Sequence, residues 1–450
     1  MRVGAWIQGC LILCAGTLGA CTQEPAPMTA ANRPAEPHSI SSATASETVP
    51  NTPPPSNEAV RLRAVFERVA AARELPILSD VAFRTLDRNE VAEMARKHVE
   101  RELPRNVLAN EAEVLVALGL VSPAYDAENG VYELLGASLT GLYEPAEKAM
   151  YLITDLSPAE RGETLAHELV HALQDQHFEL GDRLKYKAGE EERTSAEHCL
   201  AEGDATAAAF EVVRGNRAMV DETAFAEKAR ETMESVAPDV PVVYRESLIA
   251  AYTDGYTFVQ ALRKRGGFAA VNAAWKAPPT TTEQVLHLDK FDAKEPMVAV
   301  MEPSFSAITS EKEKRSWKAG YSQVVGEQGL RIVFGAWTDQ KTAVNAAAGW
   351  GGDRYVLARG EGAAAGETAL AWLIAFDTEA DANEAARVLK AQAHGNCVDR
   401  PDLGPFAWAQ NKRYVALTMG PFARGGKSAQ SKGVCKQARA WSAAVANAAK

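Results

Sequence analysis

The chain reads His-Glu-Leu-Val-His at residues 167–171, and these five residues determine how the rest of the sequence is interpreted. Residues four apart lie on the same face of an α-helix, with Cβ atoms about 5–6 Å apart. His167 and His171 can therefore bind one Zn²⁺, each through a ring nitrogen at about 2.0–2.1 Å. Glu168 lies outside this ligand pair but within reach of a metal-bound water. The pattern is typical of zinc hydrolases in which the glutamate is the general base.

The flanking residues predict that this stretch is helical. Ser157, Pro158 and Glu160 match an N-cap, a proline at the first helical position and the acidic member of a capping box. Apolar residues follow at helical spacing, at 165, 169, 170 and 173. We expect a helix from about residue 158 to the high 170s that ends before Gly181.

Two short apolar runs precede this helix, at residues 141–145 and 149–153, with a turn-like segment between them. They predict a β-hairpin that leads directly into the capping box. In metallopeptidases with this motif, the strand before the helix lies at the edge of the cleft, where extended substrate pairs with it. A hairpin with only a structural role is the alternative.

A catalytic zinc ion usually has three protein ligands and one open position. An alanine-rich helix is predicted from about residue 194 to 213, and Glu202 on it is the first candidate for the third ligand. Gly203 permits the close approach of two helices that ligation from separate helices requires. His198, one turn earlier on the same face, is placed to orient the ligands.

Two other residues remain alternatives for the third ligand. His177 lies six residues after His171, the spacing of the third histidine in H-E-x-x-H-x-x-G-x-x-H metzincins. That arrangement needs a glycine at the midpoint, and Gln174 occupies this position here. Asp254 is faintly similar to the aspartate of aspzincins.

The hydrolysis of an amide also needs a donor to the oxyanion of the tetrahedral intermediate. His287 and Tyr256, both downstream of the ligands, are the candidates. Glu283 lies one helical turn before His287, and the two could form an orienting pair. A buried, hydrogen-bonded histidine without a catalytic role is the alternative for His287.

Composition and charge limit the class of protein. The chain has 450 residues, of which 46 % are hydrophobic and 24 % charged, as in ordinary globular proteins of two or three domains. A net charge of −11 argues against nucleic acid as a partner. No stretch after the first twenty residues is long and apolar enough to span a membrane.

The N-terminal residues predict export and a lipid anchor. Residues 1–20 read as a signal peptide, with Arg2 before a short apolar core. The sequence Leu-Gly-Ala-Cys at 18–21 resembles a bacterial lipobox, which implies lipidation of Cys21, and an ordinary secretory signal is the alternative. Thr22 after this cysteine is typical of sorting to the outer membrane. Residues 21–57 are rich in Pro, Ser, Thr and Ala and predict a flexible stalk.

Three cysteines remain beyond the signal and the lipidation site. In an oxidising compartment two of them are expected to pair. Cys397 and Cys435 both lie in the C-terminal part, and we expect a disulfide between them. Cys199 is then a buried free thiol.

The C-terminal part, residues 301–450, has a different sequence pattern. Apolar runs at 331–334, 355–358, 369–376 and 414–418 predict strands, and residues 378–393 and the chain end predict helices. This combination favours an α+β domain with an antiparallel sheet. We expect residues 349–354 to form a turn without a catalytic role.

The motif at residues 167–176, followed by Leu-Ala-Glu-Gly-Asp-Ala at 200–205, resembles gluzincin-type zinc metallopeptidases. More narrowly, the chain is similar to a little-characterised set of bacterial and archaeal surface-anchored metallopeptidase-like proteins. The similar stretches also include residues 266–272, 278–287 and 349–354, so the resemblance extends over roughly residues 60–450. It implies Glu202 as the third ligand, although Thr206 stands where the family has an aspartate.

The expected fold is α+β: a mostly helical, zincin-like metallopeptidase domain at 58–300, with an active-site helix and a small edge sheet, then an α+β domain at 301–450. The expected function is that of an exported, lipid-anchored metallopeptidase. Zn²⁺ would be bound by His167, His171 and Glu202, Glu168 would be the base, and a peptide or protein would be the substrate. Two alternatives remain: a cell-envelope binding or assembly lipoprotein that turns over no substrate, and a zinc amidase acting on the cell wall.

Overall fold

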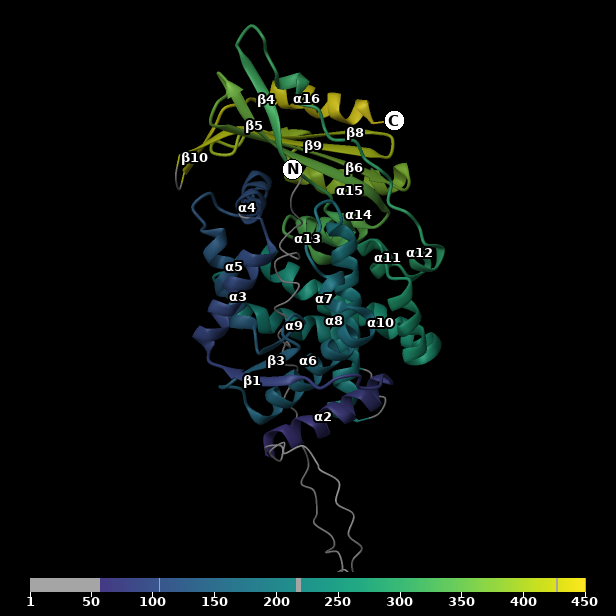
Figure 1. Ribbon diagram of the computed structural model, residues 1–450. Coiled ribbons are helices and arrows are strands. Elements are labelled where there is room, and N and C mark those ends of the chain that lie inside the picture. Colours follow the sequence, from purple (N-terminus) through teal and green to yellow (C-terminus); the bar gives the residue numbers. More distant parts are fainter. Residues whose placement is uncertain (1–56, 105, 216–219, 426–427, 450) are drawn as a thin grey trace, which may run out of the picture.

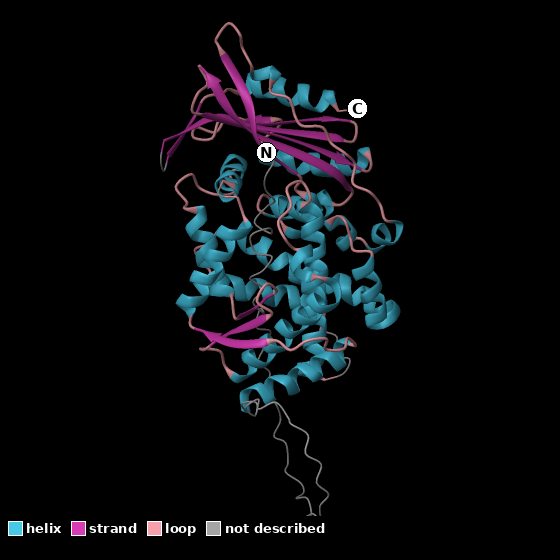
Figure 2. Ribbon diagram, viewed as in Figure 1, coloured by secondary structure: helices cyan, strands magenta, loops and turns pink. Residues whose placement is uncertain are grey.

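The computed structural model of the protein describes residues 57–104, 106–215, 220–425 and 428–449. The expected signal peptide, Cys21 and nearly all of the expected stalk lie outside these residues. Within them, no helix combines the length and apolar composition needed to cross a membrane. The described chain is an α+β protein, with a helical body that carries a small sheet and a second body built on a larger sheet (Figure 1, Figure 2).

The helical body contains the predicted active-site helix and the alanine-rich helix. Its helices are α2 (Asn57–Arg73), α3 (Arg88–Glu102), α4 (Val107–Leu118), α5 (Ala127–Ser138), α6 (Pro158–Phe178), α7 (Leu180–Arg183), α8 (Glu191–Arg214), α9 (Glu222–Val236), α10 (Val242–Lys276), α11 (Thr282–Leu286) and α12 (Leu288–Ala293). α10 is kinked at Gly266 and Gly267, whose backbone angles are not helical.

The small sheet has the strand order β1-β3-β2, from β1 (Ala82–Leu86), β2 (Gly141–Glu144) and β3 (Ala149–Ile153). β2 and β3 form the predicted antiparallel hairpin. β1, which was not predicted, runs parallel to β3. β2 is thus an edge strand, yet all four of its residues are buried.

α8 is the central helix of the helical body. All of its residues from Thr194 to Phe210 are buried, so it has no solvent-facing stripe over this length. It crosses α10 at two glycines. A Cβ atom added to Gly203 would lie 2.0 Å from the carbonyl oxygen of Gly255, and one added to Gly255 would lie 2.0 Å from that of Cys199. Gly203 therefore permits the contact of α8 with α10, not with α6 as the motif analysis assumed.

The larger sheet is antiparallel throughout, as predicted, with the order β4-β5-β6-β9-β8-β7 and β10 paired to β9. α16 covers one face, and α13, α14 and α15 lie on the other, between the sheet and the helical body (Figure 1). The elements are β4 (Arg315–Gln323), α13 (Gly326–Gly335), α14 (Gln340–Ala347), β5 (Trp350–Gly362), β6 (Glu367–Phe376), α15 (Glu379–Gln392), β7 (Cys397–Val398), β8 (Phe406–Asn411), β9 (Tyr414–Gly425), β10 (Ser428–Ser431) and α16 (Cys435–Ala448).

Two predictions for this part of the chain are wrong. Residues 331–334 lie in α13 and not in a strand, because the short apolar run at 332–334 fits a buried helix as well as a strand. Residues 350–354 begin β5, so only Gly349 remains outside it as a turn residue, with φ +74°. Asp353 in this segment is buried and accepts hydrogen bonds from the indole nitrogens of Trp350 and Trp372 at 2.9 and 2.8 Å.

The cysteines are arranged as expected from the sequence. Cys397 and Cys435 form a disulfide that joins β7 to the first residue of α16. Cys199 is a buried free thiol on α8.

The crossing of α8 and α10 generates the first prediction. Gly203→Ala should lower the free energy of unfolding by about 1–3 kcal/mol or more, because its methyl group would overlap the Gly255 carbonyl and force the helices apart. The measurement is the shift of the denaturant unfolding midpoint. The control is Gly162→Ala on α6, where a Cβ atom meets nothing within 4 Å and the helix should gain about 0.5–1 kcal/mol. Equal midpoints for the two variants would contradict the close crossing.

Candidate metal centre

The predicted active-site helix is α6, and its N-terminus is capped as the sequence indicates. The Ser157 hydroxyl accepts a hydrogen bond from the Glu160 amide at 3.3 Å, and the Glu160 carboxylate accepts one from the Ser157 amide at 2.9 Å. Pro158 occupies the first helical position. The helix ends at Phe178, and it buries His167, Glu168 and His171.

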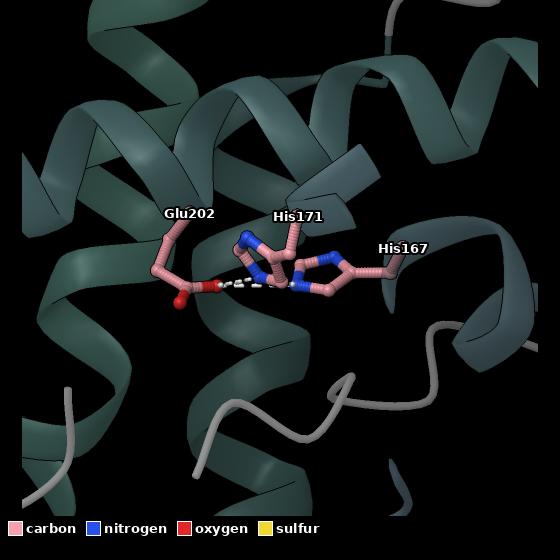
Figure 3. A group of neighbouring side chains, drawn as sticks. All are labelled: His167, His171 and Glu202. Carbon is pink, nitrogen blue, oxygen red and sulfur yellow. Dashed lines mark hydrogen bonds and ion pairs between the residues drawn. The ribbon is translucent and has the colours of Figure 1, made fainter. Parts of the chain in front are cut away.

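Three side chains from two helices converge on one point (Figure 3). The Nε2 atoms of His167 and His171 are 3.0 Å apart, and Oε2 of Glu202 lies 3.1 Å from the first and 3.6 Å from the second. A tetrahedral zinc ion with ligands at 2.0–2.1 Å holds its ligand atoms about 3.3–3.4 Å apart. The triad of His167, His171 and Glu202 therefore has the donor set and the spacing that fit such an ion.

The triad is held by further hydrogen bonds. His171 donates from Nδ1 to Oε1 of Gln174 at 2.8 Å, if its ring carries the proton on that nitrogen. This tautomer leaves Nε2 free to bind a metal. His198, as expected, lies beside Glu202, with Nε2 3.1 Å from the second carboxylate oxygen, Oε1. Gln174 thus holds His171 through Nδ1, and His198 holds Glu202 through Oε1. Neither of these two atoms belongs to the set that faces the metal position.

Gln174 connects the triad to a buried ion pair. Its amide nitrogen donates to the Ala201 carbonyl at 2.9 Å and to the Asp204 carboxylate at 3.2 Å. Asp204 is paired with Arg73 of α2 at 2.5 Å, and both side chains are fully buried. The indole of Trp275 on α10 also donates to Asp204, at 2.9 Å. Four helices, α2, α6, α8 and α10, are thus joined behind the triad.

The charges of the triad are coupled. Burial raises the pKa of Glu202, but the neighbouring His171 charge and the hydrogen bonds from the imidazoles lower it well below its usual value. Burial lowers the pKa of His171, and the Glu202 carboxylate more than offsets this and raises it to about 9. The two residues therefore form a buried imidazolium–carboxylate pair at neutral pH, and a bound cation would displace that proton.

Glu168 is the one carboxylate beside the triad that lacks a side-chain partner. It is buried, and no side chain of the described residues hydrogen-bonds to its carboxylate oxygens. Burial raises the pKa of its carboxyl group to about 8, against the opposing effects of the His171 charge and of the Tyr143 backbone amide in β2. A buried carboxyl group without a side-chain partner is unusual in a folded protein and indicates a functional group.

A small pocket lies beside His167, with a cavity volume of about 20 Å³. Its lining is largely aromatic and apolar, from Ala209, Phe210, Phe225 and Tyr252. The Tyr252 ring stacks on His167 with centroids 6.0 Å apart. The sequence analysis had singled out Tyr256, one turn further along α10. Which tyrosine lies beside His167 depends on the face of α10 that meets α6. The positions of the two tyrosines in the sequence do not specify this face.

The structure does not bring Tyr256 and His287 to the triad. The Tyr256 hydroxyl binds the backbone of Val220 and the side chain of Gln260. His287 Nε2 lies 2.8 Å from the Glu327 carboxylate of α13. This hydrogen bond raises the pKa of His287, although burial acts in the opposite direction. Both side chains are therefore structural, which corrects their assignment as oxyanion donors.

The alternative ligands also lie elsewhere. His177 is bound to the Pro76 carbonyl at 2.7 Å, and Asp254 forms an ion pair with Arg331. Glu283 does not pair with His287 but with Lys290, at 2.6 Å. Together with Glu295 and Asp377 it surrounds this ammonium group, so the chain's own cation fills that acidic cluster.

Comparison with known proteins adds one match. A family model described as "Domain of unknown function (DUF8575)" matches residues 315–421, which extend from β4 into β9 and include no residue of the triad. Neither a curated protein nor a solved structure matches the chain. The function of the centre is therefore inferred from its geometry.

The geometry predicts which side chains bind a metal. The chain should bind about one Zn²⁺, and Glu202→Ala should lose it or weaken its binding at least about tenfold. Elemental analysis after dialysis gives the stoichiometry. His177→Ala is the matched control and should bind as the parent does, because this ring contacts Pro76. Zinc retained by Glu202→Ala and lost by His177→Ala would reverse the ligand assignment.

Proposed function

We propose that the protein is a zinc-dependent metallopeptidase of the gluzincin type, exported and held at the bacterial cell envelope, in the outer membrane, by a lipid on Cys21. The observation that carries the proposal is the convergence of His167, His171 and Glu202 beside the buried carboxyl group of Glu168, which has no side-chain partner. Two neutral imidazoles and one carboxylate form a common ligand set of catalytic zinc. The zincin-like assignment of the helical body is part of the same proposal.

The three ligands would hold the ion through Nε2 of His167, Nε2 of His171 and Oε2 of Glu202. When bound, Zn²⁺ supplies a Lewis acid that polarises a carbonyl group and lowers the pKa of a coordinated water. Gln174 and His198 keep the ligands oriented from behind. None of the three ligands needs to rotate for binding, since their ligand atoms already face one another (Figure 3).

Glu168 is the residue that moves a proton. Burial raises the pKa of Glu168 in the empty site, and a cation bound beside it would favour the ionised form. A carboxylate held in these surroundings is a stronger base than a solvent-exposed glutamate. It can therefore take a proton from the attacking water and pass it to the leaving amine. Its burial keeps bulk water away from both steps.

The pocket beside His167 holds about one water molecule as it stands, so a substrate would have to widen it. Its aromatic walls, Phe210, Phe225 and Tyr252, would then suit an apolar side chain of the peptide next to the scissile bond. β2 is the edge strand nearest the helix in sequence, but its four residues are buried. Pairing of substrate with that strand is therefore not part of the proposal.

Replacement of the base tests the mechanism. Glu168→Gln should keep the zinc and the fold but lose about 10²–10⁴-fold in hydrolysis, because an amide cannot accept the proton. The assay is cleavage of a mixed peptide library, read by mass spectrometry. The control is Glu190→Gln, at an exposed position before α8 where the side chain makes no capping bond; it should cleave as the parent does.

The outcomes separate the candidate functions. Unchanged hydrolysis in Glu168→Gln would refute its role as base. A parent chain that holds zinc but cleaves no peptide would favour an envelope binding or assembly protein. Release of peptides from cell-wall fragments, without cleavage inside peptides, would favour a zinc amidase.

A further inference from the structure

α13, at the start of the second body, is packed against the crossing of α8 and α10. The side-chain nitrogen of Gln328, Nε2, donates a hydrogen bond to the Asp254 carboxylate of α10 at 2.6 Å. The same nitrogen lies 3.5 Å from the Cys199 sulfur of α8. Arg331, one turn further along α13, forms an ion pair with the same Asp254. Gln328 thus contacts both crossing helices, and Arg331 contacts α10.

These contacts lie next to the residues that hold the triad. Cys199 follows His198 directly and precedes Glu202 by one helical turn. Asp254 precedes Gly255, whose backbone touches Gly203. A shift of α10 at Asp254 therefore moves the surface on which the Glu202 segment of α8 lies.

The N-terminus of α13 is fixed from both sides. Asp353 of β5 accepts hydrogen bonds from the amides of Val325 and Gly326 at 3.0–3.1 Å, which ties α13 to the sheet. Gly326 has φ +77°, and a Cβ atom there would lie 2.1 Å from the Glu192 carboxylate of α8. Glu192 in turn accepts two hydrogen bonds from Thr282. α13 is therefore a rigid connection between the larger sheet and α8.

We propose that α13 is a positioning element of the metal centre, with Arg331 as its main positioning residue. It holds Asp254 against the α8–α10 crossing and thereby keeps the Glu202 carboxylate at the distance from His167 and His171 that a metal ion requires. The inference rests on the proposed function, since it takes the triad to be the metal site. It assigns a role in metal binding to the body that the DUF8575 model matches.

Zinc affinity of the full chain, measured by competition with a chromogenic chelator, tests this role. Arg331→Met should weaken zinc binding about tenfold, as the loss of a residue that orients ligands does. Arg331→Lys keeps the charge beside Asp254 and should restore most of the affinity. The control is Arg424→Met, which breaks a contact between the second body and Glu113 of α4, away from α8 and α10, and should leave the affinity within twofold.

The single variant Arg331→Met leaves the Asp254 charge unpaired and could therefore misfold. The double variant Arg331→Met/Asp254→Asn controls for this, because it removes both charges of the ion pair. It should fold and still bind zinc about tenfold more weakly. Parent affinity in this variant, with or without a lower unfolding midpoint, would overturn the inference alone and make α13 a merely stabilising helix. No zinc binding by the parent chain would overturn the proposed function, and the inference with it.

Discussion

The backbone contact between α8 and α10 at Gly203 and Gly255 is the constraint on which the rest of the structure depends. Because the two helices touch there, α8 is enclosed on all sides and carries Glu202 into the interior. A neighbouring face of α8 meets α6, on which the two histidines lie one helical turn apart. A side chain at either glycine would separate the helices, and the carboxylate would no longer reach the imidazoles.

The centre also shows how a buried cluster of charges is balanced. An isolated ion in an apolar interior is costly, so buried ionised groups are paired and hydrogen-bonded. Glu202 is paired with imidazoles, and Asp204 with Arg73. Among the described carboxyl groups beside the triad, Glu168 is the one without a side-chain partner, and burial raises its pKa. The departure lies where chemistry with a proton would be carried out.

The local features of the site could be predicted from the sequence. The capping box, the one-turn spacing of the histidines and the helix around Glu202 are all set by residues close together in the chain. The face of a helix that meets another element is not set in this way. Tyr252, and not Tyr256, lies beside His167, and His287 bonds to Glu327 of α13 and not to the triad, because tertiary packing decides both contacts. α13 itself was mistaken for a strand, since its apolar run is short.

The order of the chain gives α13 a further consequence. Residues 167, 171 and 202 are synthesised well before Arg331, so a growing chain contains every proposed metal ligand while α13 is still missing. If α13 sets the position of Glu202, the centre is assembled only after the first strand and helix of the second body have been made. If the protein is the proposed metallopeptidase, it would then be inactive as a nascent chain and would become active only when its C-terminal half has been made.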